Sequence, residues 1–389
     1  MKFSVAILLA MIVLFTACRS DHEDESLHRA VMVYMAADNN LGSGGYARND
    51  IREMMAGSRY LSKRDLLLVF VDDMSGQMPY IMKVEQGDTT RLHTFDTELD
   101  TADPAVLKQV MTWMFKHYKA DDYGLVLWGH ATGWEQMNNI PPASARRKAY
   151  GSDVTGGTTW MDIADMAQAL NALPHLKFIF ADCCCFQCIE TAYELRHATD
   201  YIIASPAEIP DAGAPYDTMV PAMFGRGDDF ARNMADAYYE QTLLDYKEPL
   251  SVIKTKHLEL LAQATKTVLA TLPPDRMAKP DINGLIYYYN HSMIDMNDFM
   301  LRHAAASDYE QWHRVFTQCV VYATMATTWM TDGYNPHVDF SDFEVTAQRY
   351  GGVSMFVYQE PTTAFLDKMN RTIGNMQWYD AAALSALGW

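Results

Sequence analysis

Four of the chain's six cysteines lie within Cys183–Cys188, directly after an apolar run that is typical of a buried strand. That run is Phe178–Ala181, and the residues after the cysteines, Ile189–Leu195, are predicted to begin a helix. A thiol at this position is well placed to be a nucleophile, because the positive end of a helix favours the thiolate. In an open α/β sheet, ligands also bind at the carboxyl edge of the strands.

A histidine follows a second strand-like run in the same way. Tyr123–Trp128 is almost entirely apolar and leads into Gly129 and His130. Because the carboxyl ends of parallel strands meet at one edge of a sheet, we expect His130 to lie near the cysteines. A base beside a thiol is the arrangement that nucleophilic catalysis requires.

Together these motifs resemble the clostripain family of cysteine endopeptidases, which belongs to the caspase, gingipain and legumain superfamily. The resemblance extends to three further stretches, Tyr34–Leu41, Asp200–Tyr216 and Gly352–Phe356, and therefore spans nearly the whole mature chain. It implies an α/β, caspase-like fold of three layers, α/β/α, around a mostly parallel central sheet. The alternation of predicted strands and helices from Ala30 onward agrees with such a sheet.

The family pattern places the nucleophile two residues after an aspartate and six before a glutamate. Asp182 and Glu190 both select Cys184 by this rule. The neighbouring Cys183 and Cys185 are expected to pack as small hydrophobic residues.

By the same resemblance, His130 is the histidine of a catalytic dyad, and the sequence does not support a third member. We expect Cys184 to attack the carbonyl carbon of a peptide bond, and His130 to act as general acid and base. The backbone N–H groups of Ala131 and Cys184 are expected to bind the oxyanion. Ala131 departs from the superfamily, in which glycine is usual at this position.

Carboxylates near the same edge are expected to select the substrate. In the family an acidic pocket binds Arg or Lys before the scissile bond, and the resemblance assigns this role to Asp182, with Asp211 as a second candidate. The alternation of side chains along an extended segment places Asp182 and Cys184 on one side. A bidentate contact with guanidinium would favour Arg over Lys. The alternative interpretation of Asp182 is a helix N-cap.

The segment Glu135–Gly157 is polar, lacks periodicity and contains Arg146, Arg147 and Lys148. By composition it is a solvated basic loop. The family resemblance implies that it is cleaved during activation, after a basic residue and often autocatalytically. The chain is therefore predicted to be a zymogen that is cut within Arg146–Lys148.

The N-terminal residues are predicted to direct export. Met1–Cys18 has a charged start and an apolar run too short for a comfortable transmembrane helix, which is typical of a secretory signal. Phe15–Cys18 resembles a bacterial lipobox with Cys18 as the lipidated residue; ordinary cleavage near Ala17 is the alternative. We expect an acidic tether over 19–28 and a lipoprotein at the outer membrane or cell surface of a Gram-negative bacterium.

Composition narrows the partners and the domain plan. A net charge of −18 over 389 residues argues against nucleic acid and anionic membrane surfaces. The expected partners are polypeptides with basic residues, the membrane contact is the lipid alone, and the protein is expected to be a monomer. We predict a catalytic domain over 29–216 and a mainly helical region over 217–350. Over 351–389 we predict a strand that returns to the main sheet, followed by a C-terminal tail.

Two other classes of function compete with a protease. The cysteine cluster could hold zinc or an iron–sulfur cluster, but metal sites of this kind normally combine two separated pairs, and no second pair exists. We therefore predict no metal and no cofactor, leaving calcium open because some clostripain relatives use it. The other class is a catalytically inactive, caspase-fold surface lipoprotein that binds a partner.

Overall fold

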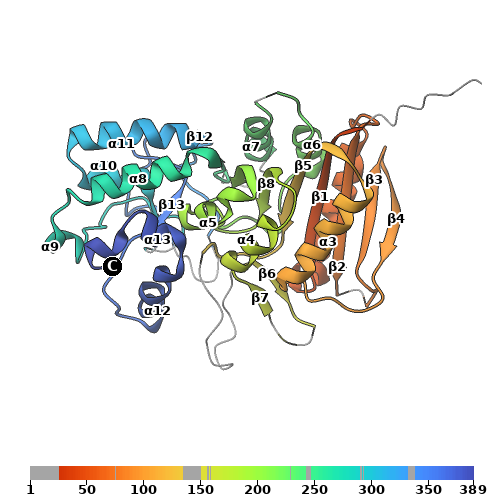
Figure 1. The fold of residues 1–389 in the computed structure, drawn as a ribbon, viewed down its shortest axis with the longest axis horizontal. Helices are drawn as coiled ribbons and strands as arrows, with labels where there is room; N and C mark the ends of the chain where they lie inside the picture. Colours follow the sequence, from red (N-terminus) through yellow and green to blue (C-terminus); the bar gives the residue numbers. More distant parts are fainter. Residues whose placement is uncertain are drawn as a thin grey trace, which may run out of the picture.

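The computed structural model describes residues 26–74, 76–134, 150–155, 157, 159–227, 229–241, 247–289, 291, 293–331 and 338–389. Within these residues a nine-stranded sheet runs through the molecule in the order β12-β10-β9-β8-β5-β1-β2-β3-β4 (Figure 1). Its central strands are β1 (Leu27–Ala37), β2 (Asp65–Asp73), β5 (Ala120–Trp128), β8 (Leu176–Asp182) and β9 (Thr199–Ala204).

These five central strands are parallel to their neighbours within the group. They are apolar along most of their length because both faces of the sheet are covered by helices. The strands predicted at Tyr123–Trp128 and Phe178–Ala181 both fall within this group.

Antiparallel strands complete both edges of the sheet. On one side β3 (Tyr80–Glu85) and β4 (Asp88–Thr94) form an antiparallel hairpin. On the other side β10 (Ser251–Lys254) pairs antiparallel with β9, and β12 (Val320–Ala323) pairs antiparallel with β10.

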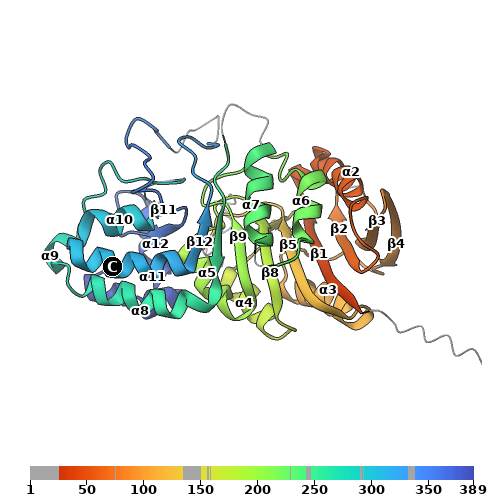
Figure 2. The same cartoon turned by 90° about the horizontal axis from the view of Figure 1, so that it is seen from above.

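Helices cover both faces, which confirms the three-layer α/β/α prediction (Figure 2). One face packs against α2 (Tyr46–Ser58), α6 (Tyr216–Met223) and α7 (Phe230–Gln241). The opposite face packs against α3 (Pro104–His117), α4 (Ile163–Asn171) and the short α5 (Ile189–Glu194). A separate two-stranded sheet, β6 (Tyr150–Asp153) and β7 (Thr159–Met161), precedes α4.

A further group of helices gathers beyond the β12 edge of the sheet (Figures 1 and 2). They are α8 (Leu258–Leu269), α9 (Pro274–Met277), α10 (Met296–His303), α11 (Ala306–Cys319), α12 (Ala364–Thr372) and α13 (Gln377–Ala381). Short 3-10 helices occupy Leu195–His197, Thr255–His257, Ile373–Asn375 and Leu384–Leu387.

One expectation about this region is corrected. The predicted strand near residue 352 does not return to the main sheet: β13 (Ser354–Phe356) pairs with β11 (Met293–Asp295) in a small sheet of its own. Within the segment 217–350, α6 and α7 cover the main sheet, and β10 and β12 extend it. Residues 320–323 form a strand within this segment because their Val-Val-Tyr run has high β propensity and pairs with β10.

In the part of the chain that the structure describes, no helix combines the length and the apolar character needed to cross a membrane. The predicted lipidation residue Cys18, residues 19–25 of the tether and the predicted cleavage residues Arg146, Arg147 and Lys148 lie outside the described residues.

Candidate active site

The carboxyl ends of β5 and β8 open onto one narrow cleft. Gly129 and His130 follow β5, whereas Asp182 ends β8 and Cys184 follows it. The cleft is lined by Leu41, Trp128, Gly129, His130, Asp182, Cys184, Ile209, Pro210, Asp211 and Gly213, and its cavity volume is about 20 Å³. Four residues that the sequence analysis singled out, His130, Asp182, Cys184 and Asp211, therefore share one site.

Exposure separates Cys184 from the other described cysteines. All five are free thiols, but only Cys184 is partly exposed; Cys183, Cys185, Cys188 and Cys319 are buried. Burial raises the pKa of the Cys188 thiol to about 12 and that of Cys183 well above its ordinary value, so both remain protonated at neutral pH. Cys184 is thus the thiol that solvent and a substrate can reach.

A backbone hydrogen bond acts directly on the Cys184 sulfur. The Ile209 N–H donates to Sγ at 3.4 Å, and the thiol lies 3.8 Å from the Ile209 carbonyl oxygen. A donated N–H favours the thiolate over the thiol. The loop that supplies Ile209 follows β9, so a third strand of the sheet contributes to the site.

Backbone hydrogen bonds join the loop that carries Cys184 to two other segments, the loop after β9 and the start of β13. The N–H groups of Cys185 and Gln187 donate to the carbonyls of Ala207 and Ser205, and the N–H of Ser354 donates to the carbonyl of Gln187. Cys185 has φ 55°, a left-handed conformation that costs a residue with a side chain roughly 1 kcal/mol. Backbone strain of this kind persists where the surroundings hold it, as they do here.

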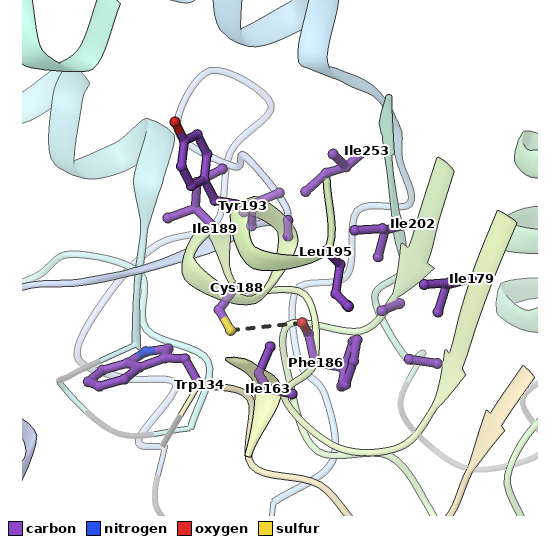
Figure 3. Close-up of a cluster of buried hydrophobic side chains, with 14 of the residues drawn as sticks. Trp134, Ile163, Ile179, Phe186, Cys188, Ile189, Tyr193, Leu195, Ile202 and Ile253 are labelled. Atoms are coloured by element: carbon purple, nitrogen blue, oxygen red, sulfur yellow. Dashed lines mark hydrogen bonds between the residues drawn. The ribbon is translucent and has the colours of Figure 1, made fainter. Parts of the chain in front are cut away.

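The far end of this loop is buried in an apolar cluster (Figure 3). Cys188 packs beside Trp134 and Ile189, its sulfur 3.8 Å from the Phe186 carbonyl. The loop after His130 approaches closely: a side chain at Gly133 would place Cβ 2.9 Å from the Cys188 sulfur. Glycine at 133 therefore allows the histidine loop and the cysteine loop to pack against each other.

The helix that follows the cysteines, α5, begins where the sequence predicts, at Ile189. Its N-cap residue is Cys188 rather than Asp182 or a residue next to Cys184. The alternative interpretation of Asp182 as the N-cap of this helix is therefore wrong.

Asp182 is instead a buried carboxylate with one oxygen unused. Its side chain is 3% exposed, and Oδ2 accepts hydrogen bonds from the Ala214 N–H at 3.1 Å and the Tyr216 hydroxyl at 2.8 Å. Oδ1 has no hydrogen-bond partner among the described residues. Burial raises the pKa of Asp182 to about 6. The loop at Gly213 packs so closely that a Cβ there would lie 2.8 Å from Oδ2.

Two carboxylates that the sequence analysis missed lie near Asp182. Asp50 on α2 accepts a hydrogen bond of 2.6 Å from the Trp128 indole, and its pKa is raised to about 9 by burial and by the charge of Asp182. Glu53, one turn further along α2, accepts from the Tyr216 N–H. The sequence signal for Asp50 was its spacing along an amphipathic helix, which places this carboxylate on the same face as Ala47 and Met54.

His130 contacts a residue that the sequence analysis included in a family motif but gave no role. Its Nε2 atom lies 2.8 Å from Oδ1 of Asn40, and its ring centroid lies 6.3 Å from that of Trp160. Asn40 begins α1 (Asn40–Ser43), shortly after β1. Ala131 is buried and forms a β-bridge with Tyr150.

Among the described residues, no group of three or more His, Cys, Asp or Glu side chains has the arrangement of a metal site. The cysteine cluster instead separates into three buried thiols and one accessible thiol.

Comparison with known proteins identifies a consistent set of relatives. The model of the clostripain family matches residues 33–383. A secreted C11 cysteine protease from Bacteroides thetaiotaomicron, solved with an irreversible peptide inhibitor, is 28% identical; the match covers 92% of this chain and 99% of that one, with a TM-score of 0.76. An inactive zymogen C11 protease from Parabacteroides distasonis is 27% identical, covering 92% of this chain and 98% of that one, also with a TM-score of 0.76.

Among curated proteins, clostripain from Hathewaya histolytica is 25% identical over 218 residues. This alignment covers 48% of the present chain and 40% of clostripain, so the chain matches less than half of that relative's length.

Proposed function

The chain belongs to the clostripain family of cysteine proteases, and from that premise we propose that it is an exported endopeptidase that cleaves after Arg or Lys. One observation supports the proposal above all others. The single accessible thiol among the described cysteines, Cys184, shares a cleft with His130 and with Asp182. Asp182 is a buried carboxylate, and its Oδ1 atom has no hydrogen-bond partner among the described residues.

In the proposed reaction the Cys184 sulfur attacks the carbonyl carbon of the scissile peptide bond. His130 transfers a proton to the leaving amine, whose departure produces a thioester. Water then attacks the thioester, releasing the acid product and restoring the thiol. Backbone N–H groups of Ala131 and Cys184 are proposed to stabilise the tetrahedral oxyanions.

Asp182 is proposed to bind the cationic side chain that precedes the scissile bond. Its unused Oδ1 offers a charge-assisted hydrogen bond to guanidinium or ammonium, and an ionic partner would offset the cost of burying the carboxylate. Asp211, exposed and lining the same cleft, is proposed to add a second negative charge.

The small size of the cleft supports activation by cleavage. A cavity of about 20 Å³ has room for little more than one water molecule, so an arginine side chain requires the site to widen. We propose cleavage within Arg146–Lys148 as the step that permits this. The relative from Parabacteroides distasonis is an inactive zymogen, which supports such a step.

The secreted relative from Bacteroides thetaiotaomicron supports export. Lipidation at Cys18, a monomeric state and the absence of a required cofactor, with calcium left open, remain part of the proposal.

The experiment measures hydrolysis of fluorogenic peptides that end in Arg, Lys, Asp or Leu, using the wild type, Cys184→Ala and the matched control Cys183→Ala. We expect cleavage after Arg and Lys, complete loss in Cys184→Ala and activity in Cys183→Ala. Loss only in Cys183→Ala would show that the neighbouring thiol is the nucleophile. If no peptide is cleaved even after trypsin has cut the Arg146–Lys148 segment, an inactive binding protein becomes the better proposal.

A further inference from the structure

The His130 side chain meets an amide at one of its two ring nitrogens. The Nε2 atom lies 2.8 Å from the Oδ1 atom of Asn40. An amide oxygen only accepts hydrogen bonds, so this contact places a proton on Nε2. In the neutral imidazole Nδ1 is then the nitrogen that can accept a proton.

The residue before Asn40 fixes the backbone at this point. Asn39 is 2% exposed, and its amide nitrogen donates to the carbonyls of Ala36 at 2.9 Å and Ser152 at 2.7 Å. Its oxygen accepts from the Leu41 N–H and so caps α1. These buried contacts join the end of β1 to β6 and set the direction in which residue 40 leaves the sheet.

The Asn40 side chain, in contrast, is exposed. Packing in the core therefore does not require an asparagine at this position, whereas the contact with His130 requires an acceptor of this length. The two residues are 90 positions apart in sequence and are brought together because β1 and β5 are adjacent parallel strands, with Met35 paired to Trp128.

We propose that Asn40 is a positioning residue for His130, which makes the site an Asn–His–Cys arrangement instead of a dyad. This inference rests on the proposed function. The amide accepts the Nε2–H bond both in the imidazole and in the imidazolium that forms during proton transfer, so it holds the ring orientation through the reaction. Because the amide is neutral, it does so without adding negative charge beside the ring.

That difference from a carboxylate provides the test. In Asn40→Asp the side chain keeps its size but gains a charge next to the imidazolium, which favours the protonated ring. The limb of the pH profile that reports on His130 should move to higher pH by about one unit. In Asn40→Ala the acceptor is lost, and we expect kcat for an Arg substrate to fall roughly tenfold, because ring orientation supplies part of a general acid–base contribution of about 10²–10⁴.

The ionisable groups that share the cleft with His130 are Cys184, Asp182 and Asp211. Asp182 would add its own limb to any profile measured with a cationic substrate. The second measurement therefore follows the rate at which iodoacetamide, a small neutral reagent, alkylates Cys184 as a function of pH, with the modified peptide identified by mass spectrometry. The matched control is Ser43→Asp, which adds the same charge to α1 at an exposed position.

We expect both profiles of Asn40→Asp to shift and those of Ser43→Asp to match the wild type. The inference is overturned if the Asn40→Asp profiles superimpose on the wild type, or if Ser43→Asp shifts as far, since charge alone would then be responsible. Thermal melts establish that each variant is folded; if Asn40→Ala is not, the isosteric Asp variant still decides. Should the wild type hydrolyse no peptide, the proposed function fails, but the alkylation profiles still test the contact.

Discussion

Two buried aspartates, Asp182 in the cleft and Asp295 in the C-terminal region, have similar pKa values but different hydrogen-bond partners. Burial raises the pKa of each to about 6. They differ in how many of their oxygens have partners, and that difference separates a carboxylate that holds the structure together from one that is available to a ligand.

Asp295 uses both oxygens. Its Oδ2 accepts from the Tyr288 hydroxyl and from the N–H groups of Gly351 and Gly352, and its Oδ1 accepts from the Asp298 N–H in the first turn of α10. The carboxylate thereby joins the end of β11 to the segment before β13. All four neighbouring groups donate hydrogen bonds to the carboxylate. A side chain that itself carries N–H donors would therefore place a donor against a donor in any orientation.

Asp182 uses one oxygen. Ala214 and Tyr216 both donate to Oδ2, while Oδ1 has no partner in the described structure. An unpaired oxygen in a buried carboxylate is costly, and native proteins retain such groups mainly where they have a role. Equal burial and an equal shift in pKa therefore do not distinguish the two sites, whereas the set of hydrogen bonds does.

The largest expected effect is that of Asp182→Asn on specificity. Replacing the charge that faces the substrate cation should lower kcat/KM for Arg peptides about a thousandfold, as removal of one partner from a buried charge pair costs about 2–5 kcal/mol. Steady-state kinetics with Arg and Leu peptides measure this, and the exposed Asp211→Asn provides a comparison that should lose less. Full activity of Asp182→Asn toward Arg peptides would show that Asp182 does not bind the substrate cation.

The same substitution should raise stability, because the folded protein holds Asp182 at a pKa of about 6, above its usual 3.8. The stability linked to this group is fully present below pH 3.8 and is lost as the pH rises through about 6. At neutral pH, keeping Asp182 ionised in its buried site lowers the free energy of unfolding by roughly 3 kcal/mol, and the neutral amide of asparagine avoids this loss. Urea unfolding should show Asp182→Asn to be more stable than wild type above pH 6. Equal stability at every pH would contradict this expectation.

Asp295→Asn is expected to lower the stability of the folded protein, in contrast to Asp182→Asn. An amide NH₂ placed in this site must face at least one N–H donor, so we expect a loss of about 2 kcal/mol in the free energy of unfolding. Urea titration measures the loss, with the exposed Asp275→Asn as control, which should change by less than about 0.5 kcal/mol. If Asp295→Asn were as stable as the wild type, the complete set of hydrogen bonds around Asp295 would not be what holds this region together.

The smallest effect is expected from Tyr216→Phe. Loss of the hydroxyl that donates to Asp182 disfavours the carboxylate further, so the pKa of Asp182 rises above about 6. Binding of a cationic substrate needs the ionised carboxylate. As the pH is lowered, kcat/KM for Arg peptides should therefore begin to fall at a higher pH than in the wild type. The shift should be about one unit or less. A profile unchanged for Arg peptides would show that Asp182 does not control this limb.

The sequence alone was sufficient to place Cys184 and His130 at one edge of the sheet. Both follow uniformly apolar runs, and such runs become parallel strands buried on two faces, whose carboxyl ends converge. It also distinguished the strands and helices of the first 200 or so residues well, because the periodicity of apolar residues is a local property. The fold class followed from that alternation and from the family resemblance.

Tertiary structure alone decided the partners of these residues. The contact between His130 and Asn40 spans 90 positions, and the unused oxygen of Asp182 depends on which donors the loop at Ala214–Tyr216 brings to it. The pairing of β13 with β11 instead of the main sheet likewise depends on which strands already occupy the sheet edge. Burial, partner choice and the number of satisfied donors are properties of packed surfaces, so no local pattern in the chain encodes them.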